Sequence, residues 1–168
     1  MSLDIDLSVA AGPWREDLPQ AEDIARLAAQ AAFDSAADKA ALGDTAEASL
    51  VLADDEFVQR LNRDYRGRDE ATNVLSFAAL DVETVIQNPD RGAPVLLGDM
   101  VIAFETVARE AVDQDKSVAD HFSHLVVHAM LHLLGYDHGT CEQAAHMEKL
   151  EVQILRGLGI SDPYGEDE

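Results

Sequence analysis

Three of the six histidines in this 168-residue chain lie within the eleven residues HAMLHLLGYDH: His128, His132 and His138. Residues four apart lie one above the other on a helix, so His128 and His132 share one face of the helix that the leucines around them predict. Gly135 permits the positive φ with which helices commonly end. The chain can therefore turn back after Gly135 and bring His138 toward the first two imidazoles.

Three imidazoles that converge from a helix and the turn after it form a metal site with one open coordination position. Neutral imidazoles suit zinc best among the abundant ions, although nickel, copper or cobalt could bind the same nitrogens. We therefore expect one Zn²⁺ per chain, bound by His128, His132 and His138. The alternative, histidines hydrogen-bonded inside a core, fits this spacing and the glycine at the turn less well.

The spacing H-x-x-x-H-x-x-G-x-x-H is that of the metzincin zinc peptidases, with one difference. Those enzymes carry a glutamate directly after the first histidine as a general base, whereas this chain has Ala129. An alanine cannot accept a proton. The sequence therefore predicts the metal scaffold without the usual peptidase mechanism.

Two further histidines precede this segment on the same predicted helix face, His121 and His124. Spacing alone would also allow His124 and His128 as the paired ligands. The turn at Gly135 favours His128 and His132, because the third ligand must be within reach. His121 and His124 are then expected to be structural or to orient the ligands.

Two segments of the chain resemble the signatures of the YbeY family of bacterial endoribonucleases. One is the run LHLLGYDH with His128 before it, and the other is NRDYRGRD at 62–69, followed by TNVLSF at 72–77. The short runs LGD at 97–99 and DPY at 162–164 also match. Ala129 stands where glycine is usual and Ala78 where proline is usual. Neither change removes a candidate ligand.

The resemblance covers nearly the whole chain and implies a zinc-dependent endoribonuclease specific for single-stranded RNA. It implies a role in the 3′-end maturation of small-subunit (16S) ribosomal RNA and in ribosome quality control. The implied partners are RNA and the small ribosomal subunit with its proteins, and neither DNA nor a membrane.

The resemblance also places Arg66 in the active cleft, opposite the metal. A guanidinium there would stabilise the charge that develops on the phosphate. Arg66 and the metal ligand His128 are therefore the expected catalytic residues. Asp137 could orient a histidine or accept a proton, or could have no catalytic role. Tyr65 and Tyr136 could stack on bases, although core packing is the more common role for a tyrosine.

The formal net charge of −21 is unusual for a protein that binds nucleic acid. Four of the twelve lysines and arginines nevertheless lie within nine residues, and we call this group the arginine cluster: Arg60, Arg63, Arg66 and Arg68. The cluster could contact RNA phosphates or could be a solvated helix face. The remaining acidic surface would repel bulk RNA, which suggests an enzyme that acts on a presented substrate.

Two other function classes fit the same histidines. One is a metallohydrolase that acts on peptides or small molecules, and the other is a non-catalytic ribosome-assembly factor with a structural zinc. The missing glutamate and the arginine cluster favour the endoribonuclease over the metallohydrolase. An open fourth metal position would argue against the assembly factor.

Composition and length are those of one ordinary domain, which we expect to span residues 1–168. No segment approaches the ~20 consecutive apolar residues of a membrane helix. The first residues, MSLDID, carry acids where a signal peptide needs bases. The single cysteine, Cys141, fits a reducing compartment, and a metal role for it is not expected because three histidines suffice. We expect a cytoplasmic protein.

Hydrophobic periodicity predicts the order βαβαββααα. The strands are expected at about 3–9, 46–53, 72–78 and 95–103, and the helices at about 19–37, 54–67, 105–115, 118–134 and 140–155. Residues 79–94 are expected to form a surface loop. The first two strands can pair in parallel, and the later ones allow an antiparallel partner. We expect an α+β fold: a single domain with a mixed four-stranded sheet and about five helices packed on it.

Overall fold

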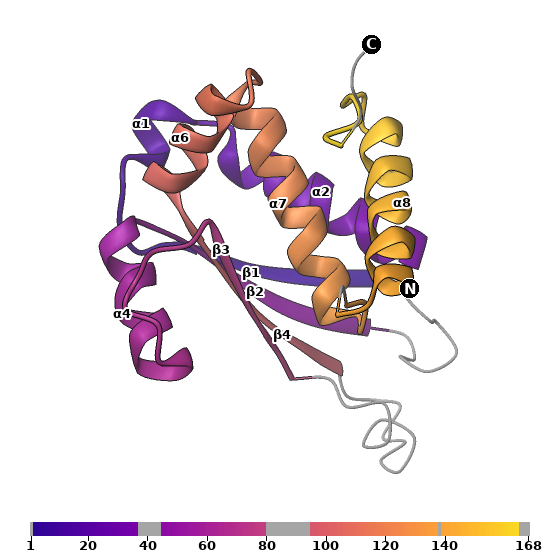
Figure 1. Cartoon of the computed structure of the whole chain (residues 1–168), viewed down its shortest axis with the longest axis horizontal. Coiled ribbons are helices and arrows are strands. Elements are labelled where there is room, and N and C mark those ends of the chain that lie inside the picture. Colours follow the sequence, from indigo (N-terminus) through magenta and orange to yellow (C-terminus); the bar gives the residue numbers. More distant parts are fainter. Residues whose placement is uncertain (1, 37–44, 80–94, 138, 165–168) are drawn as a thin grey trace.

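The computed structural model of the protein describes residues 2–36, 45–79, 95–137 and 139–164 (Figure 1). Its strands form one sheet: β1 (Ser2–Val9), β2 (Thr45–Ala53), β3 (Val74–Ala78) and β4 (Val95–Ala103). The strand order is β1-β2-β4-β3. The pairs β1–β2 and β2–β4 are parallel, whereas β3 is antiparallel to β4. The predicted mixed four-stranded sheet and the α+β class are confirmed. The expected loop at 79–94 lies, after Ala79, outside the described residues.

The helices are α1 (Trp14–Asp17), α2 (Ala21–Ala36), α4 (Asp55–Arg66), α6 (Phe104–Asp113), α7 (Val118–Leu133) and α8 (Cys141–Gly157). Five of them match the predicted helices, and α1 was not predicted. Four residues are too few for an apolar stripe to be recognised. The indole Nε1 of Trp14 donates a hydrogen bond to the carbonyl of Ala53 at 2.9 Å, so a contact distant in sequence holds this short helix.

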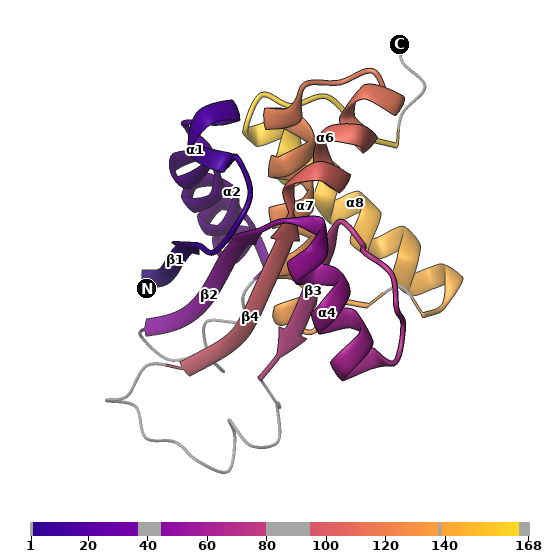
Figure 2. The ribbon, with the colours of Figure 1, turned by 90° about the vertical axis from the view of Figure 1, so that its left-hand side faces the viewer.

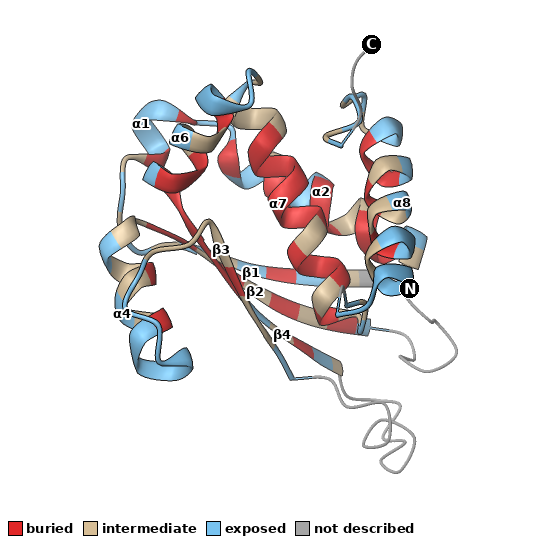
Figure 3. Ribbon diagram, viewed as in Figure 1, coloured by how far each residue is buried: buried red, intermediate tan, exposed pale blue. Residues whose placement is uncertain are grey.

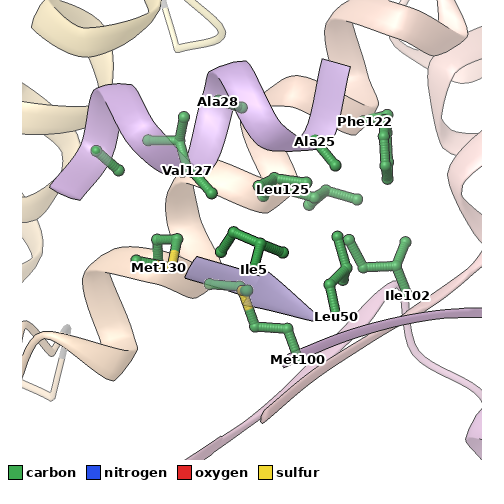
Figure 4. Close-up of a cluster of buried hydrophobic side chains, with 14 of the residues drawn as sticks. Ile5, Ala25, Ala28, Leu50, Met100, Ile102, Phe122, Leu125, Val127 and Met130 are labelled. Carbon is green, nitrogen blue, oxygen red and sulfur yellow. The ribbon is translucent and has the colours of Figure 1, made fainter. Parts of the chain in front are cut away.

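Helices cover both faces of the sheet. The larger group, which includes α2, α7 and α8, packs on one face, and α4 packs on the other (Figures 1 and 3). Strand β2 shows why both faces are apolar, because Leu50 and Leu52 point into the larger core while Val51 and Ala53 point toward α4. Side chains of α2, α7 and the strands meet in the larger core (Figure 4).

Strand β3 lies at the edge of the sheet, beside α4 (Figure 2). Its neighbour β4 contains Gly98 at φ +138°, where an added Cβ would lie 2.2 Å from the carbonyl oxygen of Phe77. Only glycine allows this approach of the two backbones. The parallel register between β2 and β4 shifts at the same place, between Glu47 and Ala48. Gly98 therefore sets how closely the edge strand lies to the rest of the sheet.

Candidate active site

A cleft of about 910 Å³ separates the face of α7 that carries the histidines from the edge strand β3. Alternate residues of β3 line it, namely Val74, Ser76 and Ala78. The opposite wall is the stripe predicted from the sequence: His121, His124, His128 and His132. Further lining residues come from the ends of α4 and α6, from the turn after α7 and from the C-terminal segment. The cleft thus draws on segments from residue 66 to residue 164.

His128 and His132 approach each other more closely than the other histidines of the stripe. Their Nε2 atoms are 3.1 Å apart, and their ring centroids 4.6 Å. The ring centroids of His124 and His128, by comparison, are 6.4 Å apart. The structure therefore brings together the pair that the sequence favoured.

The other ring nitrogens of this pair determine where the protons lie. His132 Nδ1 lies 3.0 Å from the carbonyl oxygen of Tyr136, and His128 Nδ1 lies 3.0 Å from Glu151 Oε2. A carbonyl and a carboxylate only accept hydrogen bonds, so each Nδ1 donates, and in the neutral rings each Nε2 carries a lone pair. Two lone pairs that converge at 3.1 Å suit a shared cation. Neutral imidazole nitrogens are donors that zinc prefers, so this pair fits zinc.

The predicted third ligand, His138, lies outside the described residues. Within the described ranges, no three His, Cys, Asp or Glu side chains gather as a metal-binding group. The structure therefore shows two of the three expected ligands together. The glycine turn that should deliver the third one is present, since Gly135 has φ +103°. The same turn places the Tyr136 carbonyl against His132.

Glu151 lies beneath the histidine pair and is fully buried, with 0% of its surface exposed. Its Oε2 accepts from His128, while its Oε1 lies 2.6 Å from His124 Nε2 and accepts from the Tyr164 hydroxyl at 2.7 Å. Sequence reasoning missed this residue. A signal for it exists, because Glu151 takes a place on the apolar face of α8, one turn after Met147 and one turn before Leu155.

Burial on its own would raise the pKa of Glu151. The hydrogen bonds from His124, His128 and Tyr164 act in the other direction, and the pKa is lowered to about 2. Burial and the neighbouring Glu151 carboxylate raise the pKa of Tyr164. At neutral pH the glutamate is therefore an acceptor and the tyrosine a donor.

His121 belongs to a separate network at the other end of the stripe. Its Nε2 lies 2.8 Å from Glu110 Oε1, which also accepts from Asn73 Nδ2 at 2.9 Å. Burial lowers the pKa of His121, although its hydrogen bond with Glu110 acts in the opposite direction. This network connects α7 to α6 and to the start of β3.

Arg66 reaches the cleft from the opposite face of the sheet. It is the last residue of α4, which ends at Gly67 with φ +70°. Its guanidinium donates to the carbonyl of Ser76 at 2.9 Å and lies 5.4 Å from the centroid of the Phe77 ring. Both partners belong to the edge strand, so Arg66 reaches around that edge.

The other members of the arginine cluster are exposed and do not belong to the described cleft lining: Arg60, Arg63 and Arg68. Arg63 pairs with Asp64 at 3.4 Å. Tyr65 is 73% exposed, so the core packing expected for it is wrong. Tyr136 and Asp137 line the cleft, and the Tyr136 ring stacks on His146 with centroids 5.7 Å apart.

Among the residues that the structure describes, no helix combines the length and apolarity needed to cross a bilayer.

The sequence family described as Endoribonuclease YbeY matches residues 15–159 of this chain. The Endoribonuclease YbeY of Paramagnetospirillum magneticum is 54% identical over 166 residues, which cover 99% of this chain and 98% of the relative. The Endoribonuclease YbeY of Rhodospirillum rubrum is 53% identical over 160 residues, 94% of this chain and 79% of the relative.

A solution structure of a Thermotoga maritima protein has a similar fold, with a TM-score of 0.55 at 18% identity. The similarity covers 96% of this chain and 99% of that one, and at this identity it supports the fold alone. Family membership rests instead on the sequence matches, which include Arg66, the histidines of α7 and Glu151. The chain therefore belongs to the YbeY family of endoribonucleases.

Proposed function

We propose that this protein is a zinc-dependent endoribonuclease that cleaves phosphodiester bonds in single-stranded RNA. One observation carries the proposal: two imidazole Nε2 atoms converge at 3.1 Å in a cleft that also contains a fixed guanidinium. RNA as the substrate class is supported by relatives at up to 54% identity that carry the name endoribonuclease.

Zinc bound by His128, His132 and His138 would supply a Lewis acid for a phosphoryl oxygen and would make a water molecule more acidic. The Nδ1 atoms of His128 and His132 donate to Glu151 and to the Tyr136 carbonyl. These two hydrogen bonds would keep both Nε2 lone pairs directed at the ion. His128 is in this sense both a ligand and a catalytic residue. Ala129 offers no proton acceptor, so the glutamate-based mechanism of the metzincin peptidases has no counterpart at this position.

Arg66 would bind the scissile phosphate. A guanidinium has five N–H donors, and the bond to Ser76 uses one of its terminal nitrogens. The bond to Ser76 and the contact with Phe77 restrict the rotamers of the side chain before any substrate arrives. A donor held in this way stabilises charge that develops in the transition state with little reorganisation.

The acidic surface favours a substrate that is presented by a partner. With a net charge of −21, the protein would attract free RNA weakly. This supports the proposal that the small ribosomal subunit and its proteins present the 3′ end of the 16S rRNA in the cytoplasm. Maturation of that end and ribosome quality control are the proposed cellular roles.

The test is cleavage of labelled RNA by the purified, zinc-loaded protein. We expect cleavage of a single-stranded RNA, little cleavage of the same sequence in a duplex, and loss of activity after chelation with recovery when zinc is added. A peptide panel serves as the comparison. Hydrolysis of peptides without cleavage of RNA would contradict the proposal and favour a metallohydrolase.

A further inference from the structure

Glu151 and Tyr164 connect the C-terminal segment of the chain to His128. We propose that Glu151 is a positioning residue of the metal site, which fixes the proton of His128 on Nδ1, and that Tyr164 holds Glu151 in place. The inference rests on the proposed function for the identity of the bound ion. The hydrogen bonds that carry it belong to the protein alone.

The two histidines of the pair are oriented by different means. His132 donates to the backbone carbonyl of Tyr136, and no side-chain substitution removes that acceptor. His128 donates to the side chain of Glu151, at 3.0 Å. Of these two acceptors, therefore, only the one for His128 can be removed by mutation.

The acceptor matters because a neutral imidazole can carry its proton on either nitrogen. With a carboxylate at Nδ1, the proton lies there and the Nε2 lone pair faces the Nε2 of His132 at 3.1 Å. Without the carboxylate, the proton can move to Nε2 and occupy the position that a metal ion needs. A carboxylate behind a metal-bound histidine commonly has this orienting role.

Glu151 in turn needs donors, because a buried carboxylate is costly unless it is hydrogen-bonded. The Tyr164 hydroxyl donates to Oε1 at 2.7 Å and lies 3.1 Å from His124 Nε2. Tyr164 is itself held by its backbone N–H, which donates to Asp162 Oδ1 at 2.7 Å. The order of contacts is thus Asp162, Tyr164, Glu151 and His128. The C-terminal segment belongs to the metal site although it supplies no ligand to the pair.

The experiment measures zinc affinity, by competition with a chromogenic chelator, for the full-length protein and four variants. Glu151→Met keeps the length of the side chain and removes both acceptors, and we expect ~10–100-fold weaker zinc binding. Glu151→Gln retains one oxygen and should lie between wild type and Glu151→Met. Tyr164→Phe should weaken binding several-fold. The control is Lys149→Met, at an exposed position of α8, which should bind zinc like the wild type.

A double variant tests whether Tyr164 acts through Glu151. In the Glu151→Met background, Tyr164→Phe should change the zinc affinity by no more than about twofold, because the group it would hold is gone. A purely structural role would weaken binding equally in both backgrounds.

The second readout needs neither metal nor RNA. In the metal-free protein, the imidazole ¹⁵N resonances of His128 should report a proton on Nδ1, and Glu151→Met should shift them toward a proton on Nε2. Unchanged zinc affinity and an unchanged His128 tautomer in folded Glu151→Met would overturn the proposal. If Glu151→Met does not fold by circular dichroism, wild-type zinc affinity in Tyr164→Phe overturns it instead.

The two proposals fail in different ways. A wild-type protein that binds no zinc, or does not cleave RNA, contradicts the proposed function. The His128 tautomer then still decides whether Glu151 positions the ring.

Discussion

Arg66 donates a hydrogen bond to the backbone carbonyl of Ser76 at 2.9 Å, and this contact joins the end of α4 to the edge strand β3. Among the described strands β3 is the last of the sheet and pairs with β4, so a side chain from α4 can reach its outer edge. The guanidinium thereby lies in the same cleft as the histidine pair.

The first prediction concerns catalysis by Arg66. Arg66→Ala should keep its zinc and its fold but lose ~10²–10³-fold in the rate of RNA cleavage, because one preorganised donor is removed. Arg66→Lys should recover part of the rate, since an ammonium lacks the planar fork. Single-turnover cleavage at equal zinc occupancy is the measurement. Arg15→Ala, at an exposed position on α1 outside the arginine cluster, is the control and should cleave normally. Near-normal cleavage by Arg66→Ala would remove it from the catalytic residues.

The second prediction concerns the ligand set. Single substitutions of His128, His132 and His138 by alanine should each lower zinc content well below one ion per chain, because three imidazoles define the expected site. Metal analysis after gel filtration is the measurement. His146→Ala should retain zinc, since this histidine is exposed on α8 and is not among the described residues that line the cleft. If one of these three variants keeps its full zinc content, the histidine replaced in it is not a ligand.

The third prediction concerns RNA binding by the arginine cluster. Combined substitution of Arg60, Arg63 and Arg68 by glutamate should weaken RNA binding and flatten its dependence on salt, because fewer phosphates are neutralised. Affinity for one single-stranded RNA across a salt series is the measurement. The intended contrast is with Arg66→Ala, which should affect the cleavage rate more than the affinity. If the RNA affinity changes neither with the salt concentration nor with the substitutions, the cluster is a solvated helix face.

The fourth prediction concerns pH and His121. Burial lowers its pKa from the ordinary value of 6.5, so below that pH the unfolded chain binds a proton more readily than the folded chain. The free energy of unfolding should therefore fall as the pH drops from 6.5 toward the lowered pKa. Urea unfolding of the metal-free protein between about pH 5 and 7.5 is the measurement. The free energy of unfolding of His121→Gln should fall less over this range than that of the wild type. An equal fall in the two proteins would mean that other groups cause the pH dependence.

The fifth prediction concerns Gly98. Gly98→Ala would place a Cβ 2.2 Å from the Phe77 carbonyl, at φ +138°. We expect a destabilisation of about 3 kcal/mol or more, since backbone strain and a clash act together. Gly157→Ala is the control, because open space surrounds its Cβ position on α8. Because Gly157 is the last residue of α8, this substitution should leave the free energy of unfolding close to that of the wild type. Equal stability of the two variants by urea unfolding would contradict the expected clash.

Periodic features of the sequence were enough to predict most of the fold. The mixed sheet and five of the helices follow from apolar spacing, and His128 and His132 lie together because their spacing matches a helical turn. Helix α1 was missed because its anchor is the carbonyl of Ala53, 39 residues away. A sequence pattern does not identify such a partner.

The hydrogen bonds that hold the histidines and Arg66 in place were not predicted, for a related reason. The glutamate at position 151 stands out on an apolar helix face, but its partners on α7 become apparent only when the two helices are packed together. The same is true of Ser76, which contacts Arg66 through a backbone carbonyl that every residue type possesses.

The helix that carries the histidines is also one of the most deeply packed parts of the described chain. Eleven of the sixteen residues of α7 are buried, including Val127 and Ala129 on either side of His128. Most of the α7 ribbon accordingly has the colour of buried residues in Figure 3. Folding therefore fixes the separation of the two imidazoles before any ion arrives, and binding a metal need not order the helix. By the same coupling, an ion bound there should raise the melting temperature of the whole protein with the logarithm of its concentration. Heat resistance would then report how completely a preparation is loaded with metal.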